Sequence, residues 1–127
     1  MDAKTLLYTK SHEWIESAGA KRKVGITDFA QSQLGDIVYA EFPKPGKKLA
    51  AGDEACIIES CKATASVYAP VAGTLTAVNS PLASTPEKIN TSPLDEGWLF
   101  ELDLDEGADL SSLLGLEAYE KFCKEEA

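Results

Sequence analysis

The chain has 127 residues, a length that suits one domain with a modest hydrophobic core. Twelve basic residues against 21 acidic ones give a formal net charge of −9, and no basic cluster is longer than Lys21-Arg22-Lys23. This balance disfavours binding to nucleic acid or to an anionic membrane. No apolar run reaches membrane-spanning length, and Met1-Asp2-Ala3-Lys4 begins neither a signal peptide nor an arginine-rich transit segment.

Short apolar runs rich in β-branched and aromatic residues, interrupted by Gly or Pro, predict a mainly β chain. The expected strands are 24–26, 37–42, 55–58, 66–69, 74–78 and 98–104, the third and fourth lying within wider β-like stretches at 54–60 and 64–69. Turns are expected at 43–46, 52–53 and 73, where Pro and Gly gather.

Helical signals are short and flank the strands. Thr27 or Asp28 can cap a helix that Gly35 ends, and Ser80-Pro81 has N-cap and first-turn character for a brief helix. The tail predicts a helix at about 116–125 whose apolar side chains share one face and cover the sheet. These side chains are Leu116, Tyr119, Phe122 and Cys123.

The cysteines indicate a reducing compartment, because they are odd in number and form no C-x-x-C pair. Cys56, Cys61 and the single histidine, His12, match no usual spacing of zinc ligands. We therefore expect a buried Cys56, a Cys61 in a turn, and no structural metal.

One lysine, Lys62, stands between the stretches 54–60 and 64–69, so we expect it at the tip of a hairpin. Taken alone, such a lysine is an ordinary solvated side chain. Its neighbours change the interpretation, because Glu59 precedes it by three positions and Tyr68-Ala69-Pro70, followed by Gly73, closes the second strand. The segment resembles the attachment site of lipoyl carrier domains, in which an enzyme modifies one lysine on an exposed turn.

Further motifs occur in order along nearly the whole chain. They are Ser11-His12-Glu13-Trp14, Val24-Gly25-Ile26-Thr27-Asp28-Phe29-Ala30-Gln31, Leu34-Gly35-Asp36-Ile37-Val38, Pro45-Gly46, Ile89-Asn90-x-Ser92-Pro93 and Gly97-Trp98-Leu99. With the Lys62 segment, this set resembles the H protein of the glycine cleavage system from about Tyr8 to the tail. The resemblance implies a lipoyl/biotinyl-type barrel-sandwich hybrid of short antiparallel strands, in one carrier domain of residues 1–127.

The resemblance also implies a function. Lipoate would be joined to Lys62 by an amide bond, as a mobile disulfide. It would accept methylamine from a pyridoxal-phosphate glycine decarboxylase (P protein) and carry it to a tetrahydrofolate-dependent aminomethyltransferase (T protein). Dihydrolipoamide dehydrogenase (L protein) would reoxidise it. The chain itself would be a non-catalytic carrier, expected as a monomer, that raises the local concentration of a tethered intermediate.

The resemblance assigns roles to several further positions. Glu59 and Gly73 match positions read by lipoylating enzymes, and Gly73 is also expected to be a turn glycine with positive φ. Ser11 and Glu13 match positions that hold the cationic, aminomethylated arm in a surface cleft. Ser66 stands where many members have Asp or Glu, so we expect a weaker hold. A Ser11-His12-Glu13 hydrolase triad is not expected, since consecutive strand residues alternate faces.

Other interpretations of Lys62 remain. A biotin carrier usually has methionines beside its lysine, and the lipoyl domain of a 2-oxoacid dehydrogenase lacks the Ser-His-Glu-Trp segment. A Schiff-base lysine requires a desolvated pocket. An H-like protein that relays lipoate to other proteins would keep every motif. The tail resembles mitochondrial H proteins, which favours the mitochondrial matrix, with the cytoplasm as the location if the chain is bacterial.

Overall fold

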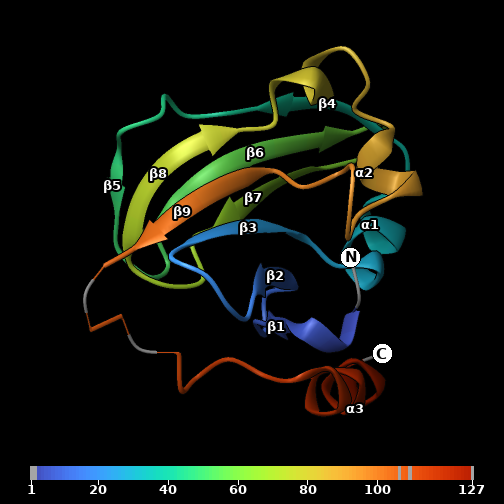
Figure 1. Ribbon diagram of the computed structural model, residues 1–127. Coiled ribbons are helices and arrows are strands. Elements are labelled where there is room, and N and C mark those ends of the chain that lie inside the picture. Colours follow the sequence, from blue (N-terminus) through green and yellow to red (C-terminus); the bar gives the residue numbers. More distant parts are fainter. Residues whose placement is uncertain (1–2, 106, 109, 127) are drawn as a thin grey trace.

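The computed structural model describes residues 3–105, 107–108 and 110–126 (Figure 1). Met1 and Asp2, on which part of the transit-segment argument rests, lie outside this range. The strands within it are β1 (Leu6–Tyr8), β2 (Glu13–Glu16), β3 (Lys21–Ile26), β4 (Ile37–Glu41), β5 (Lys48–Leu49), β6 (Glu54–Ser60), β7 (Thr64–Tyr68), β8 (Gly73–Val78) and β9 (Phe100–Leu104). The helices are α1 (Asp28–Leu34), α2 (Lys88–Thr91) and α3 (Leu116–Glu126), with 3₁₀ turns at Ala3–Thr5 and Ser80–Ala83.

The strands form two sheets, in which neighbouring strands run antiparallel. The large sheet has the order β1-β2-β3-β9-β8-β5, and the small sheet has the order β4-β6-β7. The main core lies between them and includes Ile58 and Val67 from the small sheet and Leu75 and Phe100 from the large one. Burying such a side chain stabilises the fold by about 1.5–3 kcal/mol. The sequence pattern predicts this mainly β architecture, and the resemblance predicts its short antiparallel strands.

The register of the β6–β7 hairpin decides which side chains face the core. Ile58 is paired with Ala65, and its neighbour Ile57 is paired with Ser66. Directly opposed residues share a face, and successive residues alternate between faces. Ile58 is fully buried, so Ala65 shares the inner face with it, whereas Ile57 and Ser66 belong to the outer face.

Helix α1 forms where its caps predict it. The Thr27 side chain accepts a hydrogen bond from Ala30 N at 3.2 Å, which satisfies one of the free amides of the first turn. At the other end Gly35 has φ 82° and ψ −159°, a conformation that is essentially restricted to glycine, and its N–H bonds to the Gln31 carbonyl. The chain therefore leaves the helix sharply and enters β4.

Helix α3 covers the N-terminal strands, below β1 and β2 in Figure 1. Tyr119 is buried on it and stacks on Tyr8 of β1, with ring centroids 4.7 Å apart. Leu6 and Trp14 complete this second cluster, and the Trp14 indole donates to the Pro93 carbonyl at 2.9 Å. The predicted apolar face of the tail is thus confirmed as a packing surface.

Four short elements do not appear among the predicted ones: β1, β2, β5 and α2. The predicted helix at Ser80-Pro81 is a 3₁₀ turn, whose N-cap is Asn79 and not Ser80. Asn79 makes no capping bond. Its amide donates instead to the carbonyls of Glu96 and Trp98, and so ties this turn to the segment before β9.

Candidate functional site

Lys62 lies in the tight turn that joins β6 to β7, and its side chain is exposed, as predicted. The turn is held by Ser60, whose N–H bonds to the Ala63 carbonyl at 2.8 Å. The Ser60 hydroxyl accepts from the N–H groups of Ala63 at 3.0 Å and Lys62 at 3.3 Å. Because these bonds fix the backbone of the turn, the exposed Lys62 side chain has a rigid root.

A second set of contacts braces this turn against α1 and α2. Cys61 N donates to the Asp36 carbonyl at 3.0 Å. The segment around Asp36 is in turn held by Asn90, which accepts from Ile37 N at 2.8 Å and donates to the Gly35 carbonyl at 2.9 Å. Asn90 appears in the sequence only within a family motif, and its bracing role becomes visible only in three dimensions.

The aliphatic part of the Lys62 side chain lies over Gly35 at the end of α1. A Cβ atom placed on Gly35 would stand 3.2 Å from Lys62 Cε and 3.9 Å from its Nζ. The lysine is thus directed toward the helix that forms one wall of the neighbouring groove.

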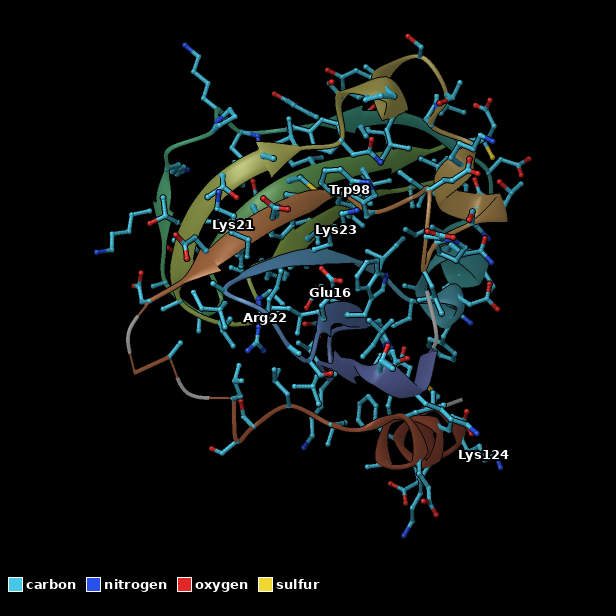
Figure 2. The ribbon with its side chains drawn as sticks, viewed as in Figure 1. Glu16, Lys21, Arg22, Lys23, Trp98 and Lys124 are labelled. Atoms are coloured by element: carbon cyan, nitrogen blue, oxygen red, sulfur yellow. The ribbon has the colours of Figure 1, made fainter. Side chains whose placement is uncertain are left out.

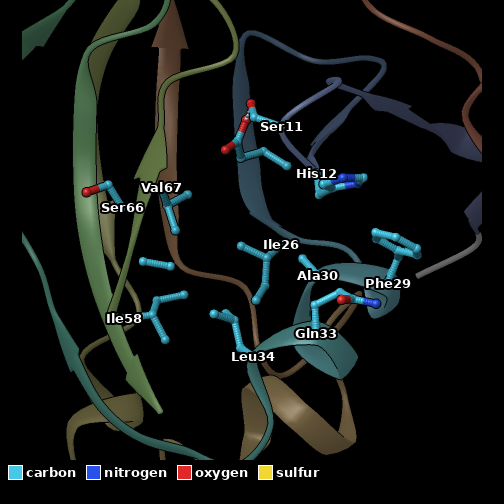
Figure 3. A pocket seen from close by; sticks show the side chains of 12 residues that line it. Ser11, His12, Ile26, Phe29, Ala30, Gln33, Leu34, Ile58, Ser66 and Val67 are labelled. Carbon is cyan, nitrogen blue, oxygen red and sulfur yellow. Dashed lines mark hydrogen bonds between the residues drawn. The ribbon is translucent and has the colours of Figure 1, made fainter. Parts of the chain in front are cut away.

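This groove has a volume of about 350 Å³ and lies between α1 and the inner face of β6 and β7, with the Ser11–Glu13 segment at one end (Figure 3). Its walls are largely apolar, and three of its polar residues, Ser11, His12 and Glu13, lie at that end. The lining residues are Ser11, His12, Glu13, Ile26, Phe29, Ala30, Gln33, Leu34, Ile58, Ala65, Ser66 and Val67. Such an apolar channel with a few converging polar groups is typical of small-ligand sites.

Glu13 is the principal polar group of the groove. It is only 2% exposed, and one carboxylate oxygen accepts hydrogen bonds from the hydroxyls of Thr9 and Ser11, both at 2.6 Å. The other oxygen lies 3.5 Å from Tyr68 N. A buried carboxylate requires such donors, and this one is positioned to attract a cation entering the groove.

His12 occupies a strained position between Ser11 and Glu13, with φ 71°, in the left-handed region. Ser11 and His12 lie in the turn before β2, so the strand alternation invoked from the sequence does not apply to them. Ser11 donates to Glu13, while His12 Nδ1 bonds to Tyr119 Oη at 2.7 Å and its ring packs on Phe29. No Ser–His pair forms.

Ser66 lines the groove, but its hydroxyl does not point into it. Figure 3 shows the Ser66 side chain on the side of β7 opposite to Val67, and the hydroxyl donates to Glu54 at 2.7 Å. This follows from the alternation of faces along β7. The Ser66 hydroxyl is therefore turned away from the groove, whereas Ser11 and Glu13 are hydrogen-bonded to each other at its end.

The two positions assigned to lipoylation recognition lie in different places. Glu59 is exposed and opposes Thr64 in the last β6–β7 pair before the Lys62 turn. Gly73 begins β8, at the end of the molecule opposite to that turn (Figure 1). The expected positive φ of Gly73 is wrong, since the glycines in that region are Gly19, Gly35, Gly46, Gly52 and Gly107. Gly73 is required for another reason: a Cβ there would stand 2.7 Å from the Asp103 carbonyl oxygen of β9.

The basic cluster on β3 is engaged within the chain (Figure 2). Arg22 donates to the carbonyls of Gly19 and Glu16, at 2.8 and 3.3 Å. The Lys23 ammonium lies 5.1 Å from the Trp98 ring centroid, in cation–π contact. Arg22 and Lys23 thus have partners within the chain.

The cysteines lie where the sequence places them. Cys56 is buried, Cys61 is exposed in the turn, and neither forms a disulfide. Burial raises the pKa of the Cys56 thiol strongly, and the charges of Glu13 and Glu54 raise it further. In the described part of the chain, no group of three or more His, Cys, Asp or Glu side chains could hold a metal ion. The helices described there also lack the length and apolar composition needed to cross a membrane.

Comparison with known proteins identifies the family. The family described as glycine cleavage H-protein matches residues 6–126, which is nearly the whole chain. The chain belongs to the glycine cleavage H-protein family. A glycine cleavage system H protein of Acidobacterium capsulatum is 51% identical over 119 residues, covering 94% of this chain and 92% of that protein. One from Thermotoga maritima is 44% identical over 119 residues, covering 94% and 96%.

A solved structure supports the same assignment at the level of the fold. The crystal structure of a glycine cleavage system H protein from Mycobacterium marinum is 31% identical and superposes with a TM-score of 0.85, covering 93% of this chain and 95% of that one. The lipoyl-type barrel-sandwich fold expected from the sequence is thereby confirmed. The relatives named here come from bacteria, so the mitochondrial location suggested by the tail finds no support among them.

Proposed function

We propose that Lys62 carries lipoate in amide linkage and that the chain is the lipoyl carrier of a glycine cleavage system. The observation that carries this proposal is the place of Lys62, an exposed amine on a braced turn whose stem lies toward a groove ending at Ser11 and Glu13. The residues present fit the group. The amine is open to a modifying enzyme, and the turn, fixed through Ser60 and Asp36, gives an arm a rigid base.

The bound group would supply a reversible disulfide at the end of a long flexible chain, which a carbon nucleophile can open and a dehydrogenase can reform. The chain's own residues supply position. Ser60 holds the root, the apolar wall of Phe29, Ala30 and Leu34 covers an arm in the groove, and Glu13 provides a negative charge at its end. Ser11 adds a hydroxyl beside that carboxylate. None of these side chains is assigned a catalytic role.

Membership of the family supports a proposal for the partners. We propose that the arm accepts the methylamine group from the pyridoxal-phosphate glycine decarboxylase, delivers it to the aminomethyltransferase and is reoxidised by dihydrolipoamide dehydrogenase. Residues 1–127 would act as one monomeric carrier domain. Glu59, beside the turn, is suited to direct contact with a lipoylating enzyme. Gly73, remote from the turn, would contribute by letting β8 approach β9. A mitochondrial location stays a prediction from the tail sequence.

The test is Lys62→Arg, which keeps the positive charge and the surface character but cannot form the lipoyl amide. Glycine–bicarbonate exchange with the decarboxylase should fall to background, while circular dichroism and the urea midpoint stay at wild-type values. The matched control is Lys44→Arg, at another exposed lysine, which should retain full exchange. Exchange that persists in a well-folded Lys62→Arg protein would refute the assignment. A protein that only relays lipoate to others would accept the group on Lys62 but support no exchange.

A further inference from the structure

The hydroxyl of Tyr119 joins two parts of the chain that border the groove. Its oxygen lies 2.7 Å from His12 Nδ1 and 2.6 Å from Thr27 Oγ1. His12 belongs to the segment at the end of the groove, and Thr27 caps α1, which forms one wall. Tyr119 itself lies on α3, and no described residue of α3 lines the groove. Helix α3 thus contacts both borders of the groove from a position outside it.

The segment from Thr9 to Glu13 forms a tight turn whose shape is set by its own hydrogen bonds. Thr9 N donates to the Glu13 carbonyl at 2.9 Å, and His12 N donates to the Thr9 carbonyl at 3.1 Å. Glu13 N donates to the Thr9 hydroxyl at 3.0 Å. The left-handed φ of His12, 71°, persists in a non-glycine residue only where neighbouring contacts hold it. The turn therefore depends on what surrounds His12.

Contacts from α1 and α3 surround His12. Thr27 N, at the start of α1, donates to the His12 carbonyl at 3.0 Å. The His12 ring packs on Phe29, with ring centroids 4.6 Å apart (Figure 3). Tyr119 adds the hydrogen bond to Nδ1. Because Phe29 also lines the groove, a shift of His12 changes the groove wall as well as the adjacent Glu13.

The bridge made by Tyr119 is removed from water. Thr27 and Glu13 are 2% exposed, and Tyr119 is 5% exposed. A tyrosine hydroxyl can both donate and accept, and the bonds to His12 and Thr27 together can use both capacities. At such buried positions water does not replace a lost partner. Loss of the hydroxyl therefore weakens the link between His12 and the start of α1.

We propose that Tyr119 is a positioning residue of the groove. Its hydroxyl holds the turn at 9–13 against the start of α1 and so fixes the Glu13 carboxylate beside the cation of the loaded arm. This inference rests on the proposed function, since Glu13 acts only on an arm that lies in the groove. Tyr119 touches neither the arm nor the transferred group. It acts through His12, which precedes Glu13 in the turn, and it lengthens the lifetime of the loaded state.

Three variants separate this role from general packing. Tyr119→Phe removes the hydroxyl and keeps the ring that stacks on Tyr8. Leu116→Ala removes packing of α3 in the second cluster and leaves the hydroxyl in place. Thr27→Ser is the conservative change, because serine keeps a hydroxyl for both the Ala30 N–H and Tyr119. The free energy of unfolding of each protein is measured in urea, and each is lipoylated to completion, as checked by intact mass.

The first measurement is the rate at which purified, methylamine-loaded protein releases ammonia and formaldehyde without the aminomethyltransferase. We expect release about threefold faster from Tyr119→Phe, a smaller change than in Glu13→Gln, because the charge is displaced and not removed. Leu116→Ala and Thr27→Ser should stay within about 1.5-fold of wild type. The double variant Tyr119→Phe/Glu13→Gln should release at the rate of Glu13→Gln alone, because two changes that act through one carboxylate are not additive.

The second measurement is amide hydrogen exchange in the protein without lipoate. Amides of residues 9–14 and 27–30 should exchange severalfold faster in Tyr119→Phe than in wild type, because the bonds from His12 N and Thr27 N depend on the bridge. In Leu116→Ala these amides should exchange at the wild-type rate. His12→Ala removes the same bridge from its other end. It serves as a second variant and should show both faster release and faster exchange.

Several results would overturn the inference while leaving the proposed function intact. One is wild-type release from a folded Tyr119→Phe protein. Another is faster release from Leu116→Ala in proportion to its loss of stability, which would make α3 a general packing element. Additive effects in the double variant would separate Tyr119 from Glu13. A wild-type protein that accepts no lipoate, or that accepts no methylamine once lipoylated, would remove the proposed function and this inference together.

Discussion

Glu13→Gln removes the charge at the end of the groove while keeping the size of the side chain. In the native protein Glu13 is 2% exposed, and its carboxylate accepts two hydroxyl hydrogen bonds at 2.6 Å. A hydrogen bond to a charged group contributes about 1.5–3 kcal/mol, and one between neutral groups about 0.5–1.5 kcal/mol. A glutamine oxygen that keeps both bonds therefore weakens each by about 1 kcal/mol, so we expect the free energy of unfolding to fall by about 2 kcal/mol.

The same change acts on the proposed arm. A cation bound beside Glu13 would lose about 1–1.5 kcal/mol, which corresponds to a lifetime roughly five- to tenfold shorter. The measurement is the rate at which purified, methylamine-loaded protein releases ammonia and formaldehyde in the absence of the aminomethyltransferase. Glu87→Gln, at an exposed position away from the groove, is the control and should release them at the wild-type rate. If Glu13→Gln also does so, the loaded arm is not held at Glu13, and the role given to the groove is wrong.

Three further predictions concern Ser66, Gly35 and Cys56. Ser66→Ala should leave the lifetime of the loaded arm within about twofold of wild type, since the Ser66 hydroxyl points to Glu54. A longer lifetime in Ser66→Asp would show instead that a side chain at this position can hold the arm. Gly35→Ala should lower the free energy of unfolding, measured in urea, by about 1–3 kcal/mol because of its backbone conformation. Lipoylation should persist in that variant, because the Lys62 stem can move away from the new Cβ whereas the backbone cannot; loss of lipoylation without loss of stability would contradict this. Burial raises the pKa of Cys56 above its unfolded value of about 8.5, so its contribution to stability is complete below that pH and declines by up to about 1.4 kcal/mol per pH unit above it. The pH dependence of unfolding should therefore be shallower above pH 9 in Cys56→Ala than in wild type, and equal slopes would exclude this linkage.

The local features of this fold could be predicted from the sequence because their causes are local. Thr27 and Gly35 mark the ends of α1 through capping and backbone geometry. The apolar spacing of the tail predicts the face of α3 that packs on Tyr8. The position of Lys62 between two β-like stretches predicts its exposed turn. In each case a few neighbouring residues contain the whole signal.

The missed features depend on distant partners. Strand β5 has only two residues, too few for an alternating pattern, and it exists because Lys48 and Leu49 pair with β8. Strand β1 has three, and its last residue, Tyr8, exchanges backbone hydrogen bonds with Leu114 near the other end of the chain. Glycine is common in turns, so the sequence predicts a turn at Gly73. Its real requirement, the close approach to Asp103 of β9, depends on a distant strand and cannot be read from local sequence.

The candidate site likewise combines features that could be predicted from the sequence with features that depend on distant parts of the chain. Lys62, Ser11 and Glu13 were identified through resemblance, and the structure brings the last two together on one groove. Neither the direction of the Ser66 hydroxyl nor the bracing of the turn through Asn90 follows from residue type. The first depends on strand register, and the second on Asn90 of α2, which lies 28 residues further along the chain than Lys62. The sequence does contain a signal for the direction of the Ser66 side chain. Successive residues of a strand face opposite sides, so the apolar Val67 is expected to face the core and Ser66 to face away from it.

The central claim is that Lys62 is the attachment point of lipoate, and intact mass spectrometry with peptide mapping tests it most directly. The purified protein is measured before and after incubation with a lipoylating enzyme, lipoate and ATP, alongside Lys62→Arg. We expect a gain of one lipoyl group, located on the peptide that contains Lys62, and no gain in the variant. A lipoyl group on a different lysine, a gain of biotin under the corresponding biotinylation reaction, or no modification of a folded wild-type protein would contradict it.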